Sequence, residues 1–229
     1  MPTFTSATSG TTGKPKTYTV TDEHIARRVA HMSDASRGVG FEACKSILVD
    51  FGARGYFGVV YPQYAVQRGI RCFHPTHGST EATVEFIKRE KIEGITSTPQ
   101  GLYNYAKAIG GSYAFNWMLA STSRLTPMMS KTIREGMGHN LWSSYACAEA
   151  GIISIASANQ IETMPQCVGK IVPDMEVRFE NGEIVLRSHL LISGYDDPAH
   201  NTAFRDGWYY TGDLGHMEDD LLILDGRRQ

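Results

Sequence analysis

Apolar stretches of two kinds alternate through the first two thirds of this chain, and the alternation limits the possible folds more than any other feature of the sequence. Short strand-like runs are separated by longer segments in which apolar residues recur at helical spacing. The predicted strands cover residues 46–51, 70–73, a short run from 95, 117–121, 141–145 and 152–156. The predicted helices begin near residue 22 and cover residues 56–67, 80–91, 102–109 and 127–136. Strands and helices that alternate at this period predict an α/β fold with a largely parallel sheet and flanking helices.

Two helix starts carry clear capping signals. Ser79 stands directly before the helix predicted over residues 80–91. Thr126 and Pro127 form a favourable N-cap and first-turn pair for the helix that follows them. These signals fix the beginnings of the two helices better than apolar spacing alone does.

The pattern changes in the last third of the chain, where almost no helical spacing remains. Residues 175–179 and 183–187 alternate like two strands around the Asn-Gly dipeptide at 181–182, which is typical of a tight hairpin turn. Further strands are predicted over residues 192–195, 208–210 and 221–224. We therefore predict an α/β subdomain over residues 1–158 and a small β-rich subdomain over residues 159–229.

Charge and composition exclude several classes of partner. The 229 residues include 22 Lys and Arg against 24 Asp and Glu, a net charge of −2, so we expect no nucleic acid and no anionic membrane as a partner. No apolar run approaches the about 18 residues of a membrane span, and the N-terminus lacks the features of a secretory signal. The cysteines lie far apart and never form a Cys-x-x-Cys pair, which argues against disulfides and a zinc site. We expect a cytoplasmic protein.

The first twenty residues are predicted as a polar loop that runs into a strand at residues 17–20, and this loop holds the strongest chemical signal. Residues 8–16 read Thr-Ser-Gly-Thr-Thr-Gly-Lys-Pro-Lys. Glycines let a backbone approach a phosphate closely, hydroxyls donate to its oxygens, and lysine supplies positive charge. The spacing is not that of a Walker A loop, because Gly10 and Gly13 are only three apart and a proline follows Lys14. From composition alone, a flexible linker is an equal alternative.

The segment at 8–16 resembles the phosphate loop of the adenylate-forming superfamily, which includes acyl-CoA synthetases, firefly luciferase and nonribosomal-peptide adenylation domains. Residues 145–149, Tyr-Ala-Cys-Ala-Glu, resemble the family's Tyr-Gly-x-Thr-Glu motif. Residues 207–214 are similar to Gly-Trp-x-x-Thr-Gly-Asp-Leu almost throughout, and Ser-Gly-Tyr at 193–195 resembles part of the segment before it. Leu-Asp-Gly-Arg at 224–227 resembles the start of the Gly-Arg-x-Asp hinge motif. An ordered series of this kind is far more specific than any one motif.

The resemblance implies ATP-dependent activation of a carboxylate, with release of pyrophosphate. Glu149 would hold Mg²⁺, and Glu149 and Lys14 would act in catalysis, because joining two anions requires neutralising charge. Tyr145 would lie against the adenine, and Asp213 would accept hydrogen bonds from the ribose hydroxyls with Arg227 assisting. The nucleotide-binding residues implied in the phosphate loop are Thr8, Ser9, Gly10, Thr11, Thr12, Gly13 and Lys14. Structural alternatives are a core aromatic at Tyr145, a surface acid at Glu149 and a turn residue at Asp213.

The sequence departs from the family pattern in two motifs and in length. Ala148 occupies a nucleotide-binding position where the family has a Thr whose hydroxyl contacts the α-phosphate. Residues 121–125, Ser-Thr-Ser-Arg-Leu, replace the Gly-x-x-Pro-Leu loop that borders the adenine. Family members are more than twice as long, with a subdomain before the phosphate loop and a mobile domain after the hinge. We therefore expect a homodimer, or a partner chain that covers the missing subdomains.

The substrate is the part of the function on which the sequence says least. Counting back from Gly69 places Arg54 where family members contact their carboxylate substrate, so Arg54 is the candidate substrate-binding residue. A guanidinium there would suit a substrate with a second anionic group; an exposed loop arginine is the alternative. Two functions stay open: an acyl-adenylate-forming ligase acting on a small carboxylate, and a non-catalytic or partner-dependent ATP- or AMP-binding module. An unrelated P-loop ATPase is a weaker alternative.

Overall fold

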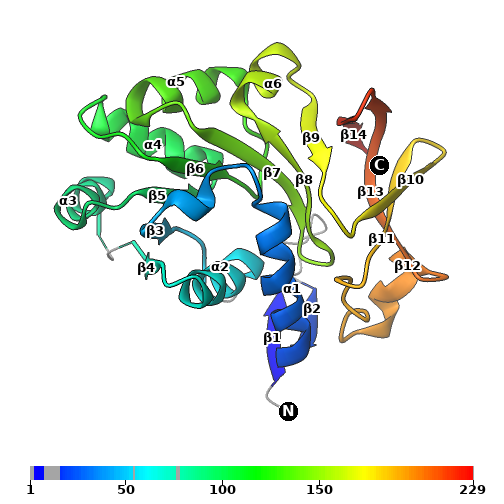
Figure 1. Ribbon diagram of the computed structural model, residues 1–229. Coiled ribbons are helices and arrows are strands. Elements are labelled where there is room, and N and C mark those ends of the chain that lie inside the picture. Colours follow the sequence, from blue (N-terminus) through cyan, green and yellow to red (C-terminus); the bar gives the residue numbers. More distant parts are fainter. Residues whose placement is uncertain (1–2, 8–15, 54, 76–77, 229) are drawn as a thin grey trace.

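The computed structural model describes residues 3–7, 16–53, 55–75 and 78–228 (Figure 1). The helices over these residues are α1 (Asp22–Ala35), α2 (Tyr56–Gln67), α3 (Thr80–Glu90), α4 (Pro99–Ile109), α5 (Pro127–Met137) and α6 (Ala158–Thr163), with short 3-10 turns at Phe41–Ala43 and Pro198–Ala203. The first strands are β1 (Thr3–Ala7), β2 (Thr17–Thr21), β3 (Ser46–Val49), β4 (Arg71–Phe73), β5 (Gly94–Ser97), β6 (Trp117–Ala120) and β7 (Leu141–Cys147). The remaining strands are β8 (Gly151–Ser157), β9 (Cys167–Ile171), β10 (Glu176–Glu180), β11 (Glu183–Arg187), β12 (Phe204–Arg205), β13 (Trp208–Glu218) and β14 (Leu221–Arg227).

One large sheet organises the chain. Its strand order is β10-β11-β13-β14-β9-β8-β7-β6-β5-β3-β4, and β12 pairs with β13 beside that path. Strands β4, β3, β5, β6 and β7 are parallel, whereas every pair from β7–β8 to β10–β11 is antiparallel. The α/β fold with a largely parallel, helix-flanked sheet and a β-rich C-terminal part is thereby confirmed. The division into subdomains at residue 158, where β8 gives way to α6, stays a prediction.

Two hydrophobic cores lie on the two faces of the parallel part of the sheet. Ile47 and Val49 of β3 belong to the core beneath α1 and α2, whereas Leu48 belongs to the core beneath α3, α4 and α5. Trp117 and Met118 of β6 divide in the same way. Because successive side chains of a strand point to opposite faces, a strand covered on both sides is apolar throughout. This explains the unbroken apolar runs of the sequence.

Capping residues set the helix boundaries as predicted. Ser79 Oγ accepts a hydrogen bond from the backbone N–H of Ala82 at 3.2 Å, and Thr126 Oγ1 accepts one from Met129 at 3.3 Å. Helix α2 has the predicted bounds. Helix α4 begins at Pro99, earlier than predicted, because Thr98 caps it.

Three predictions of secondary structure were wrong. Residues 3–7 are not loop but form β1, which pairs antiparallel with β2, the strand that was predicted at residues 17–20. The last third contains α6 and β9, both too short for the sequence pattern to show. Residues 192–195 form no strand, because the chain bends at Gly194, where φ is 147° and the Asn201 side chain packs closely.

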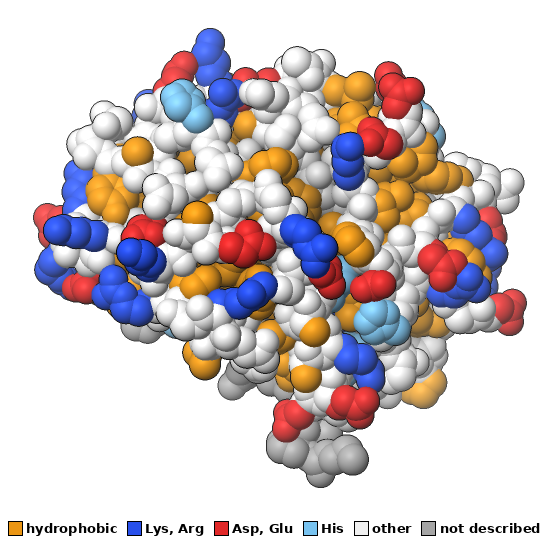
Figure 2. Space-filling view, viewed as in Figure 1, with side chains coloured by type: hydrophobic (Ala, Val, Ile, Leu, Met, Phe, Trp, Pro, Cys, Tyr) orange, Lys and Arg blue, Asp and Glu red, His pale blue; other side chains and the backbone are white. Residues whose placement is uncertain are grey.

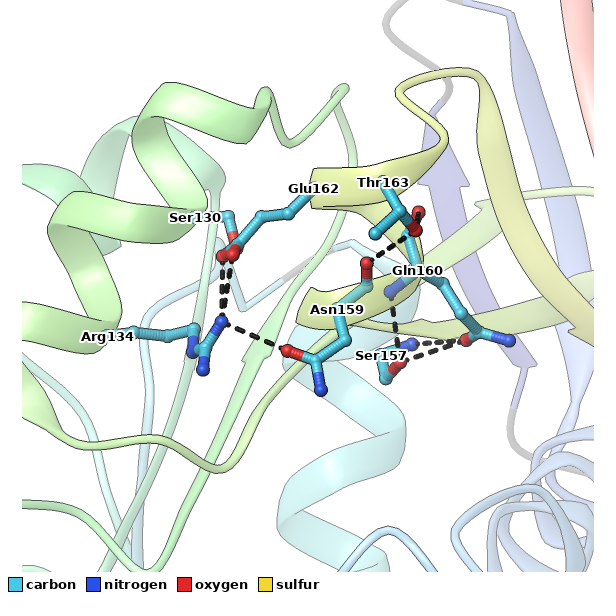
Figure 3. Close-up of polar contacts among 7 residues, drawn as sticks. All are labelled: Ser130, Arg134, Ser157, Asn159, Gln160, Glu162 and Thr163. Carbon is cyan, nitrogen blue, oxygen red and sulfur yellow. Dashed lines mark hydrogen bonds and ion pairs between the residues drawn. The ribbon is translucent and has the colours of Figure 1, made fainter.

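Helix α6 is held by its own cap and by α5 (Figure 3). Ser157 and Gln160 form a reciprocal capping box at its start. Arg134 of α5 forms an ion pair of 2.9 Å with Glu162, which also accepts a hydrogen bond from Ser130 Oγ at 2.7 Å. A six-residue helix has little intrinsic stability, so these contacts supply what propensity does not.

Gly169 lies where the two halves of the sheet meet. Its φ is 91°, and a Cβ atom at this position would collide with the backbone of Ile155 on β8. On the other side, Gly169 pairs with Leu222 of β14. Only glycine fits this close approach of backbones.

The surface carries charges of both signs, interspersed over the face that Figure 2 shows. Large exposed hydrophobic side chains among the described residues are Val66, Met128 and Met217. None of the described helices has the length and apolar character to cross a bilayer. All four cysteines are free thiols in this structure.

Candidate functional site

A pocket of about 420 Å³ opens beside the carboxyl end of β7. Its walls comprise residues 122–125, 143–146, 165–168 and 224–227, together with Ile161 and Asp213. The segment at 165–168 follows α6, so the contacts between α5 and α6 in Figure 3 support one wall. Tyr145, Asp213 and Arg227, three residues predicted for nucleotide binding, all line this pocket.

A hydrogen bond joins Tyr145 to Asp213 across the pocket wall. The Tyr145 hydroxyl donates to Asp213 Oδ2 at 2.7 Å, although β7 and β13 are not neighbours in the sheet. Burial and the adjacent Asp213 carboxylate raise the pKa of Tyr145 well above its usual value, so the phenol stays protonated and donates. The guanidinium of Arg227 lies 3.6 Å from Asp213 Oδ1, since the two residues are cross-strand partners on β13 and β14.

Glu149 lies in the turn between β7 and β8 and is only 6% exposed. The hydroxyl of Tyr195 donates to Glu149 Oε1. Among the described residues, no basic side chain forms an ion pair with this carboxylate. A buried carboxylate without a neutralising cation is unusual.

This carboxylate fits Mg²⁺ in one respect. Magnesium is commonly bound through one or two carboxylates together with waters and substrate phosphates, not by a cage of protein ligands. The described residues contain no group of three or more His, Cys, Asp or Glu side chains arranged for a metal. Glu149 therefore suits a metal shared with phosphates, and it does not suit a metal held by the described side chains alone.

Arg28 of α1 holds the backbone of the same turn. It is 2% exposed, and its Nη2 donates to the carbonyl oxygens of Ala148 at 3.0 Å and of Glu149 at 2.9 Å. The same guanidinium also donates to the Leu190 carbonyl oxygen and lies 5.0 Å from the centre of the Tyr56 ring. No motif of the sequence points to Arg28, although its spacing from Ile25 on the apolar face of the first helix is a signal for burial.

The loop at residues 121–125 forms part of the pocket wall. Ser121 and Ser144 are joined by a hydrogen bond of 2.8 Å between their hydroxyls. Thr122 adopts a φ of 74°, which is rare for a β-branched residue. Arg124 donates to the carbonyl oxygen of Pro165 at 2.9 Å and thus ties two walls together.

The predicted phosphate-loop residues Thr8, Ser9, Gly10, Thr11, Thr12, Gly13 and Lys14, and the predicted substrate residue Arg54, lie outside the described residues. Lys16 is the first described residue after this loop, and its ammonium is 5.0 Å from the centre of the Tyr195 ring. The carbonyl oxygen of Thr17 accepts a hydrogen bond from the backbone N–H of Asp196 at 2.9 Å. Lys16 is therefore close to the residue that contacts Glu149.

The family model for AMP-binding enzymes matches residues 3–196 of the chain. The chain is 27% identical over 242 residues to a 2-succinylbenzoate–CoA ligase of Listeria innocua, a match that covers 96% of this chain and 48% of that protein. It is 34% identical over 99 residues to the long-chain-fatty-acid–CoA ligase FadD15 of Mycobacterium bovis, covering 41% of this chain and 16% of that protein. The chain spans about half the length of the relatives that it matches along most of its own sequence.

The fold is also that of a solved structure, O-succinylbenzoate coenzyme A synthetase (MenE) from Bacillus subtilis in complex with ATP and magnesium ion. The TM-score is 0.81 and the identity 19%, over 97% of this chain and 49% of that chain.

Proposed function

Because the chain belongs to the AMP-binding enzyme family, we propose that it uses ATP and Mg²⁺ to activate a carboxylate, forming an acyl-adenylate and releasing pyrophosphate. The two sequence relatives named above are CoA ligases. The observation that carries the proposal is the pocket in which Tyr145, Asp213 and Arg227 meet. Its volume of about 420 Å³ lies within the about 300–1,000 Å³ of small-molecule sites.

Asp213 is the residue proposed to hold the ribose. An ionised carboxylate has about four acceptor positions, so the Tyr145 hydroxyl leaves room on Asp213 for the two ribose hydroxyls. The hydrogen bond also fixes the orientation of both side chains before the nucleotide arrives, which lowers the entropic cost of binding. The adenine is proposed to lie against the Tyr145 ring, with Arg227 beside Asp213.

Glu149 and Lys14 are proposed to act where the phosphates lie. Mg²⁺, when bound, supplies charge that polarises the phosphoryl oxygens and favours departure of pyrophosphate. Glu149 would hold the metal, and Lys14 with the other phosphate-loop residues would bind the β- and γ-phosphates. Ala148 supplies only a methyl group where a hydroxyl would contact the α-phosphate, so we expect slow adenylation.

A second candidate function follows from the alanine at residue 148. A chain that binds ATP or AMP but lacks the hydroxyl at residue 148 would serve as a nucleotide-binding module that depends on a partner for chemistry. For either function we propose a cytoplasmic location, and a homodimer or a partner chain as the assembled form. The proposed substrate is a small carboxylate that Arg54 selects.

Carboxylate-dependent exchange between ATP and radiolabelled pyrophosphate tests the proposal on the 229-residue chain. Exchange that requires a carboxylate and disappears in Asp213→Asn supports the ligase. Nucleotide binding in calorimetry with no exchange, over a panel of mono- and dicarboxylates, supports the binding module. If neither binding nor exchange occurs at millimolar ATP, both functions are refuted.

A further inference from the structure

Tyr195 and Glu149 form a hydrogen-bonded pair inside the protein. Tyr195 is 7% exposed, and its hydroxyl donates to Glu149 Oε1. We propose that Tyr195 is a positioning residue, which holds one carboxylate oxygen of Glu149 so that the other is presented to Mg²⁺. This inference rests on the proposed function, because it takes Glu149 as the metal-binding carboxylate.

The backbone around Tyr195 is fixed by contacts that do not involve the Glu149 carboxylate. The Asn201 amide accepts a hydrogen bond from the Tyr195 N–H at 2.7 Å and donates one to the Tyr195 carbonyl oxygen at 3.3 Å. A Cβ atom at Gly194 would lie 2.9 Å from Asn201 Oδ1, so glycine allows this contact. The Phe204 ring packs edge-on against the Tyr195 ring at 5.8 Å between centroids. The phenol therefore reaches Glu149 from a rigid support.

The backbone of Glu149 is fixed by other residues. Its carbonyl oxygen accepts hydrogen bonds from Arg28 Nη2 and from the Ile192 N–H, both at 2.9 Å. Removing the Tyr195 hydroxyl thus releases the Glu149 carboxylate and leaves the turn in place. Outer hydrogen-bond partners of metal ligands typically contribute about 10–100-fold to metal affinity.

Tyr195 is suited to act as a donor, because a phenol carries its proton at neutral pH and an ionised carboxylate can only accept. Lys16 lies over the same ring at 5.0 Å from its centroid, which places a cation from the end of the predicted phosphate loop beside this pair. The Tyr195 side chain thereby contacts both Glu149 and Lys16.

Calorimetric titrations of ATP into the 229-residue chain, at a series of Mg²⁺ concentrations and in EDTA, test the proposal. Tyr195→Phe is expected to raise the Mg²⁺ concentration at half-maximal enhancement of ATP binding by about 10–100-fold, with no change in affinity in EDTA. Asn201→Ala keeps the phenol but loosens its support, and it is expected to shift the midpoint in the same direction by a smaller factor. Tyr210→Phe is the matched control, because the Tyr210 hydroxyl donates to Glu180 Oε2 at 2.7 Å elsewhere in the sheet.

A double-mutant cycle separates positioning from folding. Glu149→Gln is expected to abolish the Mg²⁺ dependence, and Tyr195→Phe should then have no further effect. A wild-type midpoint in Tyr195→Phe, or an equal loss of ATP affinity in EDTA, overturns the inference while leaving the proposed function intact. If ATP binding to the wild type does not depend on Mg²⁺, the metal role of Glu149 fails and the inference fails with it.

Discussion

The guanidinium of Arg28 donates a hydrogen bond to the carbonyl oxygen of Glu149, 121 positions further along the chain. The bond connects α1 to the turn between β7 and β8, and thus connects the first helix after the predicted phosphate loop to the proposed metal site. Charged side chains are rarely buried unless their donors are satisfied. Here main-chain carbonyl oxygens, including that of Leu190, accept from Arg28.

Arg28→Met is expected to lower the free energy of unfolding by about 3 kcal/mol, because several buried carbonyl oxygens lose their donor. Urea denaturation followed by fluorescence measures the change. Arg27→Met is the matched control: Arg27 is 42% exposed and pairs with Glu23, so its replacement should change stability by less than about 0.5 kcal/mol. Equal effects of the two substitutions would show that the carbonyl contacts of Arg28 add nothing.

Asp213→Asn is expected to weaken ATP and AMP binding by at least about tenfold, since charged acceptors form hydrogen bonds worth roughly 1.5–3 kcal/mol. Calorimetry with each nucleotide measures the loss. Asp220→Asn, at an exposed position paired with Lys170, serves as the control and should bind as the wild type does. Unchanged affinity in Asp213→Asn would remove Asp213 from the site.

Ala148→Thr is expected to increase carboxylate-dependent pyrophosphate exchange. Because one donor to developing charge is worth about 10²–10³-fold in rate, a gain of at least about tenfold is expected even with imperfect geometry. Initial rates at saturating ATP measure it, and Ala148→Val, which has a similar shape without the hydroxyl, should give no gain. A faster Val variant would mean that bulk at residue 148, and not a hydroxyl, limits the rate.

Stability is expected to fall in mild acid because of the buried histidines of α1. Burial, followed by the positive charges of Arg28 and Arg27, lowers the pKa of His24 to about 4, and burial also lowers the pKa of His31. The unfolded chain binds protons at these residues below about pH 6.5, whereas the folded chain does so only at lower pH. The contribution to stability is therefore complete above pH 6.5 and is lost as the pH falls toward 4.

His24→Gln should reduce the loss of stability between pH 7 and pH 5 by about 2 kcal/mol, the linkage expected for this shift. Urea denaturation at the two pH values provides the measurement. His216→Gln, at an exposed position, is the control and should leave the pH dependence close to that of the wild type. Parallel pH profiles for His24→Gln and the wild type would contradict the prediction.

Local signals made much of the fold predictable. Helix α2 and the caps Ser79 and Thr126 follow from residues within a few positions of each boundary. Helix α6 and β9 are short and depend on tertiary contacts, such as the pair Arg134–Glu162, which no local pattern contains. Around Gly194 the sequence pattern predicted a strand that does not form. The neighbouring residues are typical of strands, but the backbone there is held by Asn201, which lies further along the chain.

In the candidate site, too, some residues could be predicted from local sequence and others could not. Tyr145 and Asp213 could be predicted from motifs, and the structure brings them together. Arg28 and Tyr195 could not, since their roles arise from contacts with Glu149 across long sequence separations. Helical spacing indicated that Arg28 is buried, and Tyr195 belongs to a recognisable motif. Neither signal indicated that the residue contacts Glu149.

Gly169 limits which substitutions the sheet beneath the pocket can accept. It lies between β8 and β14 in the sheet order, and Tyr145 and Asp213 stand on strands to either side of that junction. The Tyr145 hydroxyl and Asp213 Oδ2 are nevertheless 2.7 Å apart, although the strand that carries Gly169 lies between their strands in the sheet order. Any side chain at Gly169 would collide with the backbone of Ile155 and would have to separate β9 from β8. A substitution at this residue, which does not line the pocket, is therefore expected to change the spacing between Tyr145 and Asp213.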